Sequence, residues 1–436
     1  MEIAVVGTGY VGLVTGVCLA EMGHHITCID IDREKIAKLQ NGQSPLYELG
    51  LDELLTQNQK RGRLHFTTDY HAVSKAKAVF LAVGTPTSPS GQADLRALME
   101  ASTSVAQNMG AQTVIVIKST VPVGTGQRIK ELIKKHTDKT FYVVNNPEFL
   151  REGTAVKDFM NPDRIVIGYE DAFSRELLTK LYAPLIDSGH PLHEMSNASA
   201  EMAKYASNSF LATKISFIND MAKLCERVGA DIEDVQKTMG TDPRIGKHFL
   251  FPGIGYGGSC FPKDIKALIH TAREREVDPG LLTEVEKINQ RQKLLAVERI
   301  KARLGDLKGK TIALWGVSFK PHTDDVREAP SLTIAKKMIE EGGKVQFYDP
   351  VAKDRFLTAM GESKPMLKAF DDMYECLRGA QALILATEWP EFKNPDLKRM
   401  KECLEVPIIF DGRNIYSTEK MLAAGFSYEG IGKRII

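Results

Sequence analysis

The opening segment places the strongest constraint on the fold of this chain. An apolar run, Glu2–Val6, leads into Gly7-Thr8-Gly9-Tyr10-Val11-Gly12, and then come a helix-like segment and a second apolar run that ends at Asp30. A strand, a glycine turn, a helix and a second strand ending in an acid are typical of a βαβ unit. Its turn lets a pyrophosphate approach the N–H groups of the helix N-terminus. The opening therefore predicts a dinucleotide site, and the simpler alternative is a glycine-rich turn without a ligand.

The residues after the glycine turn bear on which dinucleotide is bound. Asp30 would accept hydrogen bonds from the adenosine ribose hydroxyls and would repel a 2′-phosphate, which favours NAD over NADP. Arg33 and Lys35 follow closely enough to weaken this preference, and Lys35 is itself a candidate cofactor contact. Thr85 and Thr120 end later strands and could line the nicotinamide side, although hydroxyls at such positions equally often form turns or caps.

Strand-like and helix-like segments alternate from residue 1 to about 195, as in a parallel α/β sheet. The pattern returns from Lys310 to Ile436, where the opening order is echoed without its glycine triplet. We therefore expect an α/β protein with two Rossmann-like doubly wound domains, the second adapted to a different ligand. The strands are expected at Glu2–Val6, Ile26–Asp30, Ala78–Val83, Thr113–Lys118, Phe141–Val144, Arg164–Ile167, Thr311–Val317, Lys344–Tyr348, Ala382–Ala386 and Pro407–Phe410.

A long helical stretch separates the two α/β regions. Apolar residues recur at helical spacing from Ala198 to Val228, where Gly229 ends the pattern, and a second helix is expected over Pro279–Leu304. A helix of this length exceeds a normal globular helix, so we expect it to join the domains or to pack against a partner subunit. The expected domains are 1–197, a central helical domain over 198–305 that carries a cysteine loop, and 306–436.

Composition excludes several classes of function. The 436 residues are too many for one compact core, and a net charge of +1 gives no electrostatic case for a nucleic-acid or membrane-surface partner. No apolar run reaches the ~20 residues that span a bilayer, and the chain enters a strand-like run at once, without a signal peptide. The six cysteines are scattered and form no CxxC pair, which argues against a disulfide framework or a metal site and favours a reducing cytoplasm.

One cysteine lies in a distinctive loop, Phe251 to Asp264, which reads FPGIGYGGSCFPKD. Its glycines let the backbone approach something closely, since glycine lacks a Cβ. Pro262 suits a first helical position, so Cys260 should lie at or just before a helix N-terminus, where the dipole favours the reactive thiolate. Lys263 would support the thiolate and Asp264 would oppose it. Cys260 is therefore the candidate nucleophile, whereas Cys18, Cys28 and Cys225 fit buried positions.

Other candidate site residues have weaker signals and plausible structural alternatives. Lys204 and Asn208 share a face of the long helix, where a lysine is either a surface group or a partly buried functional one. Glu148 and Glu152 lie in a loop after a strand and are either solvated or part of a site. Three cations lie in loops at strand ends of the C-terminal region, Lys320, Arg327 and Arg413. They suit either a phosphate-bearing ligand or a salt-bridged domain interface.

Taken together, these motifs closely resemble the UDP-glucose/GDP-mannose dehydrogenase family. The match is nearly full length and keeps the family's order from GTGYVG through KSTVPVG, NPEFLREGTA, NPDRIVIG, EMAKYASNSFLATKISFIN, FPGIGYGGSCFPKD and GVSFKPHTDDVRE to FDGRN. The GYGGSCFPKD block is the most specific of them. The resemblance implies a twofold oxidation of UDP-glucose to UDP-glucuronate by two NAD+, and a homodimer built on the long helix. It also implies that the N-terminal domain holds NAD and the C-terminal domain the UDP half.

The resemblance also implies residue roles. Cys260 is the expected nucleophile, and Lys204 and Asn208 are expected to stabilise an oxyanion. Asp264 is expected to partner Lys204 and to order water, and Glu148 to act as acid and base in thioester hydrolysis. Thr120 is expected to hold water and to contact the cofactor. Further cofactor contacts are expected from Glu152, Lys263 and Arg327. The expected UDP-sugar contacts are Glu148, Phe149, Leu150, Arg151, Glu152, Lys204, Asn208, Phe249, Leu250, Phe251, Pro252, Gly253, Gly257 and Lys320, with Arg244 and Arg413, one of them across a dimer interface.

Two alternatives remain open at this point. GDP-mannose and UDP-N-acetylmannosamine 6-dehydrogenases share the chemistry and much of the sequence, although the tyrosine and phenylalanine of GYGGSCFPKD are more similar to the enzymes that act on UDP-glucose. A non-catalytic NAD-sensing or assembly protein could use the same scaffold. The presence of Cys260, Lys204 and Asp264 together argues against it, because a binding module has no need of all three.

Overall fold

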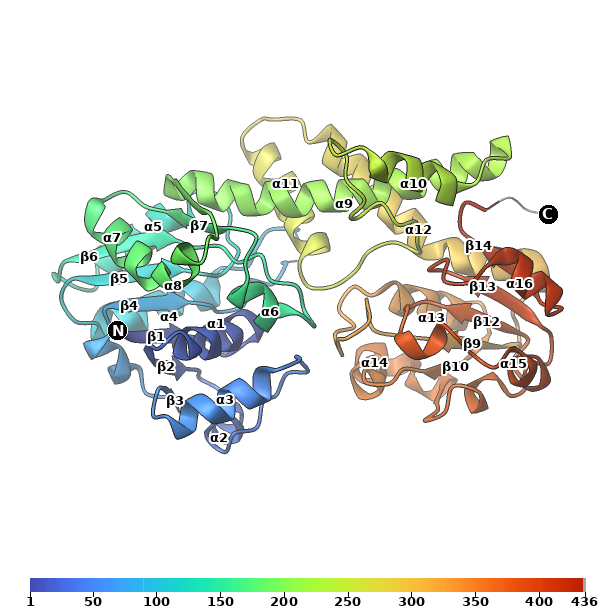
Figure 1. The fold of residues 1–436 in the computed structure, drawn as a ribbon, viewed down its shortest axis with the longest axis horizontal. Coiled ribbons are helices and arrows are strands. Elements are labelled where there is room, and N and C mark those ends of the chain that lie inside the picture. Colours follow the sequence, from blue (N-terminus) through green and yellow to red (C-terminus); the bar gives the residue numbers. More distant parts are fainter. Residues whose placement is uncertain (89, 434–436) are drawn as a thin grey trace. The chain divides into compact units, whose positions relative to one another are not determined.

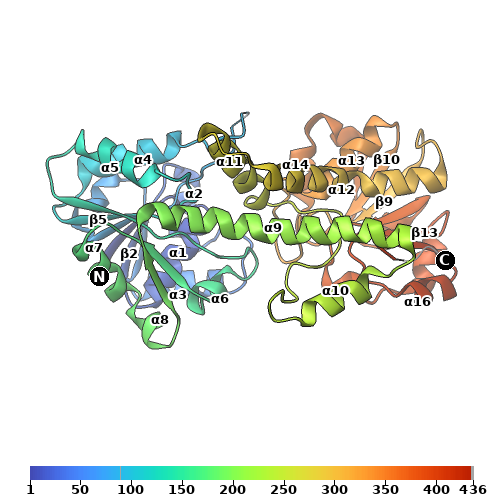
Figure 2. The ribbon, with the colours of Figure 1, turned by 90° about the horizontal axis from the view of Figure 1, so that it is seen from above.

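A computed structural model describes residues 1–88 and 90–433. The chain forms two compact units, one made of residues 1–207 and 266–277 and the other of residues 208–265 and 278–436 (Figure 1). Two helices contribute to both units: α9 (Asn197–Val228), continuous over 32 residues (Figure 2), and α11 (Phe261–Glu274). The long helix was thus predicted to within one residue of its start.

The first unit is built on an eight-stranded sheet with the order β3-β2-β1-β4-β5-β6-β7-β8. All neighbouring strands run parallel except β6 and β7, which are antiparallel. The order changes direction at β1, the topological switch point at which such sheets bind dinucleotides. The strands are β1 (Glu2–Val6), β2 (His25–Ile29), β3 (Leu64–Thr67), β4 (Ala78–Leu81), β5 (Thr113–Ile117), β6 (Phe141–Asn145), β7 (Ile165–Gly168) and β8 (Leu192–Met195).

Helices bury both faces of this sheet, which is why its central strands are apolar without alternation. In β5, Val114 and Val116 join the core against α1, α3 and α6, while Ile115 and Ile117 join the core against α4 and α5. The helices of this unit are α1 (Tyr10–Glu21), α2 (Arg33–Gln40), α3 (Leu51–Lys60), η1 (Tyr70–Lys75), α4 (Arg96–Asn108), α5 (Thr125–Lys134), α6 (Ala155–Met160), α7 (Ala172–Leu181) and α8 (Ala183–Asp187).

The second unit contains a six-stranded, all-parallel sheet with the order β11-β10-β9-β12-β13-β14. This is the same 3-2-1-4-5-6 order as the first six strands of the other sheet, so the predicted pair of doubly wound folds is confirmed. The strands are β9 (Thr311–Trp315), β10 (Lys344–Tyr348), β11 (Leu367–Ala369), β12 (Ala382–Leu385), β13 (Ile408–Asp411) and β14 (Ser427–Gly430).

Helices again cover both faces of the second sheet. One core packs β9 and β10 against α12 and α13, and the other packs the opposite face against α15 and α16. The helices here are α10 (Ile232–Thr241), α12 (Gly280–Leu304), α13 (Pro330–Glu340), α14 (Lys353–Met360), η2 (Gly361–Met366), η3 (Glu375–Leu377), η4 (Pro390–Phe392), α15 (Leu397–Cys403) and α16 (Thr418–Ala423).

Four strands were not predicted from the sequence, and they are the edge strands of the two sheets: β3, β8, β11 and β14. A central strand such as β4 is buried throughout, whereas both ends of β8 are half-buried and its middle is exposed. An edge strand has only one hydrogen-bonded neighbour and needs no continuous apolar run, so the pattern that reveals a central strand is weak there.

Candidate active site

The glycine turn after β1 has the geometry that a dinucleotide fingerprint requires. Gly7 has a φ of +97°, and a Cβ there would lie 2.7 Å from the Ala82 carbonyl oxygen. Gly9 is the N-cap of α1, and a Cβ on Gly12 would lie 1.9 Å from the Gly7 carbonyl oxygen. The turn therefore cannot form with larger residues at Gly7 or Gly12, and it leaves the first N–H groups of α1 available to a pyrophosphate.

Asp30 lies directly after β2, beside this turn. Its carboxylate accepts the Thr8 N–H at 2.8 Å and the Thr8 hydroxyl at 2.7 Å, and Lys35 Nζ lies 3.0 Å away. Burial alone would raise the pKa of Asp30, but the hydrogen bonds from Thr8, Asp32 and Lys35 hold it below its usual value. Asp30 is therefore ionised at neutral pH, as a ribose acceptor that repels a 2′-phosphate must be.

We expect Asp30→Ala to weaken NAD+ binding and to reduce the preference for NAD+ over NADP+ by about 10- to 100-fold, because a hydrogen bond to a charged acceptor contributes ~1.5–3 kcal/mol. Dissociation constants for both dinucleotides, measured by fluorescence titration, test this. The control is Asp32→Asn, since Asp32 caps α2 through the Lys35 N–H and asparagine retains that cap. Unchanged selectivity in Asp30→Ala would refute the ribose assignment.

A buried carboxylate that the sequence analysis did not identify joins two loops of the candidate site. Glu48 accepts a short hydrogen bond from the Tyr10 hydroxyl and bonds from the N–H groups of Gly153 at 2.7 Å and Ala155 at 2.8 Å. It therefore links the glycine turn of α1 to the end of the NPEFLREG loop. A glutamate in the loop before α3 gives no motif in the sequence, so only the fold reveals this role.

The ends of β4 and β5 meet through the two predicted threonines. The Thr85 hydroxyl donates to the Thr120 carbonyl oxygen at 2.8 Å, and the Ser119 hydroxyl donates to the Val83 carbonyl oxygen at 2.6 Å. The hydroxyl of Thr85 thus has a structural partner, as the simpler interpretation required, and it also fixes Thr120 at the carboxyl edge of the sheet.

Glu148 and Lys204 form a buried ion pair in the first unit. The Glu148 Oε1 to Lys204 Nζ distance is 3.0 Å, and both side chains are almost inaccessible to solvent. Glu148 also accepts the Leu150 N–H at 2.6 Å. Burial alone would raise the pKa of Glu148, but Lys204, the Leu150 N–H and Lys118 hold it below its usual value. Lys204 is therefore a buried lysine and not a surface group, and its functional role stays a prediction.

The residue after Glu148, Phe149, has two cations close to its ring. The Arg164 guanidinium lies 3.7 Å from the centre of the Phe149 ring and Lys204 Nζ lies 5.1 Å from it. Cations over an aromatic face are attracted by its quadrupole. The ring therefore helps to fix Lys204 and the NPEFLREG loop with respect to each other.

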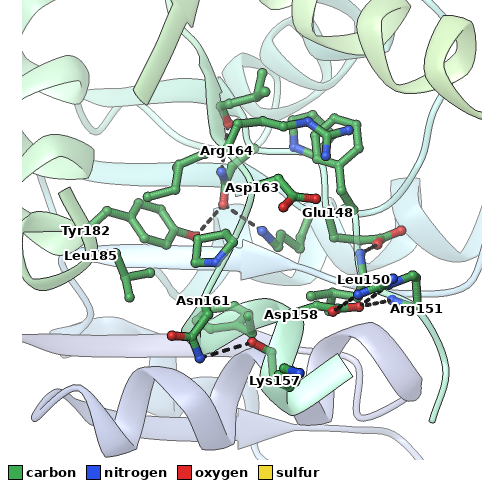
Figure 3. A pocket seen from close by; sticks show the side chains of 18 residues that line it. Glu148, Leu150, Arg151, Lys157, Asp158, Asn161, Asp163, Arg164, Tyr182 and Leu185 are labelled. Atoms are coloured by element: carbon green, nitrogen blue, oxygen red, sulfur yellow. Dashed lines mark hydrogen bonds and ion pairs between the residues drawn. The ribbon is translucent and has the colours of Figure 1, made fainter. Parts of the chain in front are cut away.

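A cavity of about 230 Å³ lies beside Glu148 (Figure 3). On its wall, Asn146 accepts hydrogen bonds from Lys118 Nζ at 2.9 Å and from the Tyr182 hydroxyl at 2.6 Å. Burial lowers the pKa of Lys118 to about 8, against the opposing attraction of Glu148. Lys118 was not predicted as a site residue, although it is the first residue of the KSTVPVG motif, because a single lysine at a strand end carries no specific signal.

In the second unit, Cys260 immediately precedes α11, and its carbonyl oxygen accepts the Asp264 N–H at 2.8 Å. This is the first bond of the helix, so Cys260 occupies the N-cap position as predicted. None of the six cysteines is in a disulfide; the side chain of Cys260 has intermediate exposure, whereas the other five are buried. Ser259 Oγ lies 3.6 Å from Cys260 Sγ. A half-exposed thiol at a helix N-terminus fits a nucleophile.

Asp264 is fully buried one turn into α11 and receives a donor on each oxygen. Asn208 Nδ2 donates to Oδ2 at 2.6 Å, and Lys263 Nζ pairs with Oδ1 at 2.6 Å. The amide of Asn208 on α9 is therefore oriented by Asp264, close in the chain to the thiol. The hydrogen bond between Asn208 and Asp264 was not predicted from the sequence, and the expected pairing of Asp264 with Lys204 stays a prediction.

The glycines before Cys260 are required because this loop packs against other parts of its own unit. A Cβ on Gly257 would lie 2.4 Å from the Glu328 carbonyl oxygen, and one on Gly258 would lie 2.9 Å from the Phe319 ring. The Gly258 N–H also donates to the Arg327 carbonyl oxygen at 2.8 Å. The loop and the GVSFKPHTDDVRE segment thus support one another.

The candidate cations of the second unit differ in their surroundings. Arg413 is anchored by the Ala386 carbonyl oxygen at 2.7 Å, and its guanidinium would meet a Cβ on Gly253 at 3.2 Å. Lys320 Nζ lies 5.4 Å from the centre of the Phe319 ring. Arg327 pairs with Asp325 and Arg244 pairs with Asp242, and both arginine side chains are exposed. Of these cations, Arg413 lies against the loop at Gly253, and Arg327 accepts a hydrogen bond from it through its carbonyl oxygen, whereas Arg244 lies on an exposed turn.

In residues 1–88 and 90–433, no group of three or more His, Cys, Asp or Glu side chains is arranged to hold a metal ion. None of the helices within these same residues is both long and apolar enough to cross a membrane.

Comparison with known proteins agrees with this geometry. Models of the UDP-glucose/GDP-mannose dehydrogenase family match residues 1–186 as the NAD binding domain, 198–291 as the central domain and 313–418 as the UDP binding domain. The chain is 46% identical to UDP-glucose 6-dehydrogenase YwqF of Bacillus subtilis (100% of this chain and 98% of that protein) and 44% identical to UDP-glucose 6-dehydrogenase of Pseudomonas aeruginosa (99% and 98%).

Solved structures give the same result. A UDP-glucose dehydrogenase from Pyrobaculum islandicum superposes with a TM-score of 0.92 at 36% identity, covering 99% of this chain and 98% of that one. A UDP-D-ManNAc dehydrogenase from Pyrococcus horikoshii superposes with a TM-score of 0.88 at 29% identity, covering 99% of each. The expected NAD cofactor and dehydrogenase activity are confirmed. This chain belongs to the UDP-glucose/GDP-mannose dehydrogenase family.

Proposed function

We propose that this protein oxidises UDP-glucose to UDP-glucuronate in two NAD+-dependent steps through a covalent intermediate on Cys260. The observation that carries the covalent step is the half-buried Cys260 thiol at the N-terminus of α11. The substrate is inferred from relatives that match the whole chain at 41–46% identity and are named UDP-glucose 6-dehydrogenases.

The chemistry explains why a cysteine is needed. Bound NAD+ accepts a hydride from carbon in each oxidation. Loss of a hydride from C6 and of the hydroxyl proton converts the primary alcohol to an aldehyde, which has a removable hydride only after a nucleophile has added to it. The Cys260 thiolate adds to the carbonyl carbon and forms a thiohemiacetal. Loss of its hydride gives a thioester, which water cleaves to the carboxylic acid and the free thiol.

The residues around this chemistry have distinct proposed roles. Lys204 and Asn208 stabilise the oxyanion of the tetrahedral intermediates, and such a donor typically contributes ~3 kcal/mol. Glu148 and Asp264 are candidate bases for thioester hydrolysis, and the buried, ionised Glu148 suits that role. Thr120, fixed at the end of β5, is the proposed water-holding hydroxyl.

Binding roles follow the two units. We propose that NAD is held by Gly7, Gly9, Tyr10, Val11, Gly12, Asp30 and Lys35, with contributions from Thr85, Thr120, Glu152, Lys263 and Arg327. We propose that the UDP-sugar is held by the segments 148–152 and 249–253, by Gly257, Lys320 and Arg413, and by the catalytic Lys204 and Asn208. The anchored guanidinium of Arg413 fits a phosphate or uracil contact, and the exposed Arg244 fits a contact supplied to a partner subunit.

Steady-state NADH formation with a panel of nucleotide sugars tests the proposed substrate. We expect a kcat/KM for UDP-glucose at least ~100-fold above those for GDP-mannose and UDP-N-acetylmannosamine, since a site built for one hydrogen-bonding pattern rejects others strongly. A preference for either of the other sugars would reassign the substrate within the family. An absence of NADH with all three would favour the non-catalytic alternative.

We further propose a homodimer formed through α9 in a reducing, cytoplasmic environment, which suits six cysteines that form no disulfide. The helix has two apolar faces. Tyr205, Ile218 and Cys225 are buried, whereas Phe210, Phe217 and Leu224 recur every seven residues and are 65%, 45% and 54% exposed. A regular exposed apolar row of this kind is typical of a helix that packs against a second copy.

Phe217→Glu is therefore expected to convert the dimer to a monomer, because it places a charge in the middle of a desolvated interface. Sedimentation velocity measures the change in mass. Leu422→Glu, which changes an exposed leucine of α16, serves as the control. Dimers of unchanged stability in Phe217→Glu would exclude this face of α9 as the interface.

A further inference from the structure

Three polar residues at the start of α9 form a row along one face of the helix. Asn197, Glu201 and Lys204 are spaced four and three residues apart, which places them side by side. All three lie in the first compact unit and are held by hydrogen bonds or an ion pair within it. The row begins where α9 starts and ends at the ion pair with Glu148, so it spans the part of the helix that faces the candidate site.

Each member of the row binds a different segment. Asn197 Oδ1 accepts the N–H of Asn145, the last residue of β6, at 2.8 Å. Lys204 pairs with Glu148, three residues after that strand. Between them, Glu201 accepts the Gly124 N–H at 2.6 Å and the Gly126 N–H at 2.7 Å.

Gly124 and Gly126 belong to the N-terminus of α5, directly after the segment that carries Thr120. Gly124 is the N-cap of α5 and has a φ of +94°, and the helix dipole there favours a carboxylate. Glu201 Oε1 also accepts Asn145 Nδ2 at 3.2 Å. One carboxylate therefore joins α9, the loop between β5 and α5, and the end of β6.

The packing around this carboxylate leaves little freedom. Glu201 is 3% exposed. A Cβ on Gly126 would lie 2.8 Å from Asn145 Nδ2 and 3.3 Å from Glu201 Oε1. Burial raises the pKa of Glu201 even though the N–H and amide donors oppose the shift. A buried carboxylate is a costly helix cap compared with a serine or threonine hydroxyl, so a role beyond capping would explain its presence.

We infer that Glu201 is a positioning residue, which fixes the Thr120 loop with respect to Lys204 and Glu148 and so sets the geometry of the oxyanion and water-activating groups. The inference rests on the proposed function of those groups. Catalytic groups must be held within a fraction of an ångström, and supporting hydrogen bonds from outside the reacting atoms provide this. The helix α9 supplies both Lys204 and, one turn earlier, the carboxylate that holds the loop opposite it.

Glu201→Gln tests the inference, because glutamine has the same shape but replaces one acceptor oxygen with a donor that faces an N–H. We expect kcat to fall by roughly 30- to 100-fold, with the KM for NAD+ and for UDP-glucose each within about 3-fold of wild type. The control is Asp171→Ala, which removes the carboxylate cap of α7 that accepts the Ser174 N–H at 2.7 Å. This control should lower Tm without changing kcat.

Gly126→Ala is the second variant, and it applies equally if Glu201→Gln does not fold. Alanine is the better helix former, so α5 should be retained, but its methyl group would lie 2.8 Å from Asn145 Nδ2 and 3.3 Å from Glu201 Oε1 and would disturb the hydrogen bonds of both. We expect the same loss of kcat, with a modest loss of Tm. A wild-type kcat in folded Glu201→Gln or in Gly126→Ala would overturn the inference and leave Glu201 as a structural cap. Failure of the proposed function is distinguishable, because the wild-type protein itself would then form no NADH from UDP-glucose.

Discussion

Replacing Cys260 with alanine is expected to abolish formation of the acid while leaving NAD+ binding intact. Without the thiol, the aldehyde cannot become a thiohemiacetal, and its carbon cannot give a second hydride to NAD+. Loss of a covalent nucleophile typically lowers the rate of a reaction by several orders of magnitude, and we expect the rate of acid formation to fall at least about 1,000-fold. The half-exposed position of Cys260 at a helix N-terminus means that its removal creates no large cavity in the core.

The acid is measured by chromatography of the nucleotide-sugar products, and NAD+ binding by fluorescence titration. Cys403→Ala is the matched control, since Cys403 is a buried free thiol of α15 with no proposed role in catalysis. It should retain kcat with a modest loss of Tm. Acid production at a near wild-type rate by Cys260→Ala would exclude the covalent mechanism.

The second large effect is expected from Lys204. Lys204→Met should lower kcat by about 100-fold or more, because it removes the cation that stabilises the oxyanion. It should also destabilise the protein by ~3–5 kcal/mol, because Glu148 would keep a buried charge without its nearest partner. Initial rates and chemical denaturation measure the two effects separately.

The double variant Lys204→Met with Glu148→Gln separates stability from catalysis. Removing both charges relieves the unpaired carboxylate, so much of the lost stability should return. The turnover should not return, because neither the cation nor the base is present. A rise in KM with an unchanged kcat in Lys204→Met would show instead that Lys204 serves only to bind the substrate.

The fold could be predicted from the sequence where burial imposes a simple pattern. Central strands such as β1 and β5 are buried on both faces and read as apolar runs, and their predicted and observed bounds agree to within a residue. The edge strands β3, β8, β11 and β14 carry no such run and were missed. Their place in the sheet depends on the order of strands, which is a tertiary property.

The candidate site could be predicted only where one segment carries its own signal. The Cys260 loop and the glycine turn before α1 have local reasons for their residues, and the structure gives both the expected geometry. The partners of Glu148 and Asp264 could not be predicted, because Lys204 and Asn208 are brought to them by tertiary packing. Glu48 and Glu201 gave no signal for the same reason, since a buried carboxylate that binds backbone N–H groups fits no linear motif.

The number of NADH molecules formed per UDP-glucose tests the central claim most directly. With limiting sugar and excess NAD+, absorbance at about 340 nm gives this ratio, and a twofold oxidation through a tethered intermediate requires two hydride transfers for each sugar. We predict two NADH per UDP-glucose, with UDP-glucuronate as the product. One NADH per sugar, with release of the aldehyde, would contradict the account and remove the need for a covalent bond to Cys260.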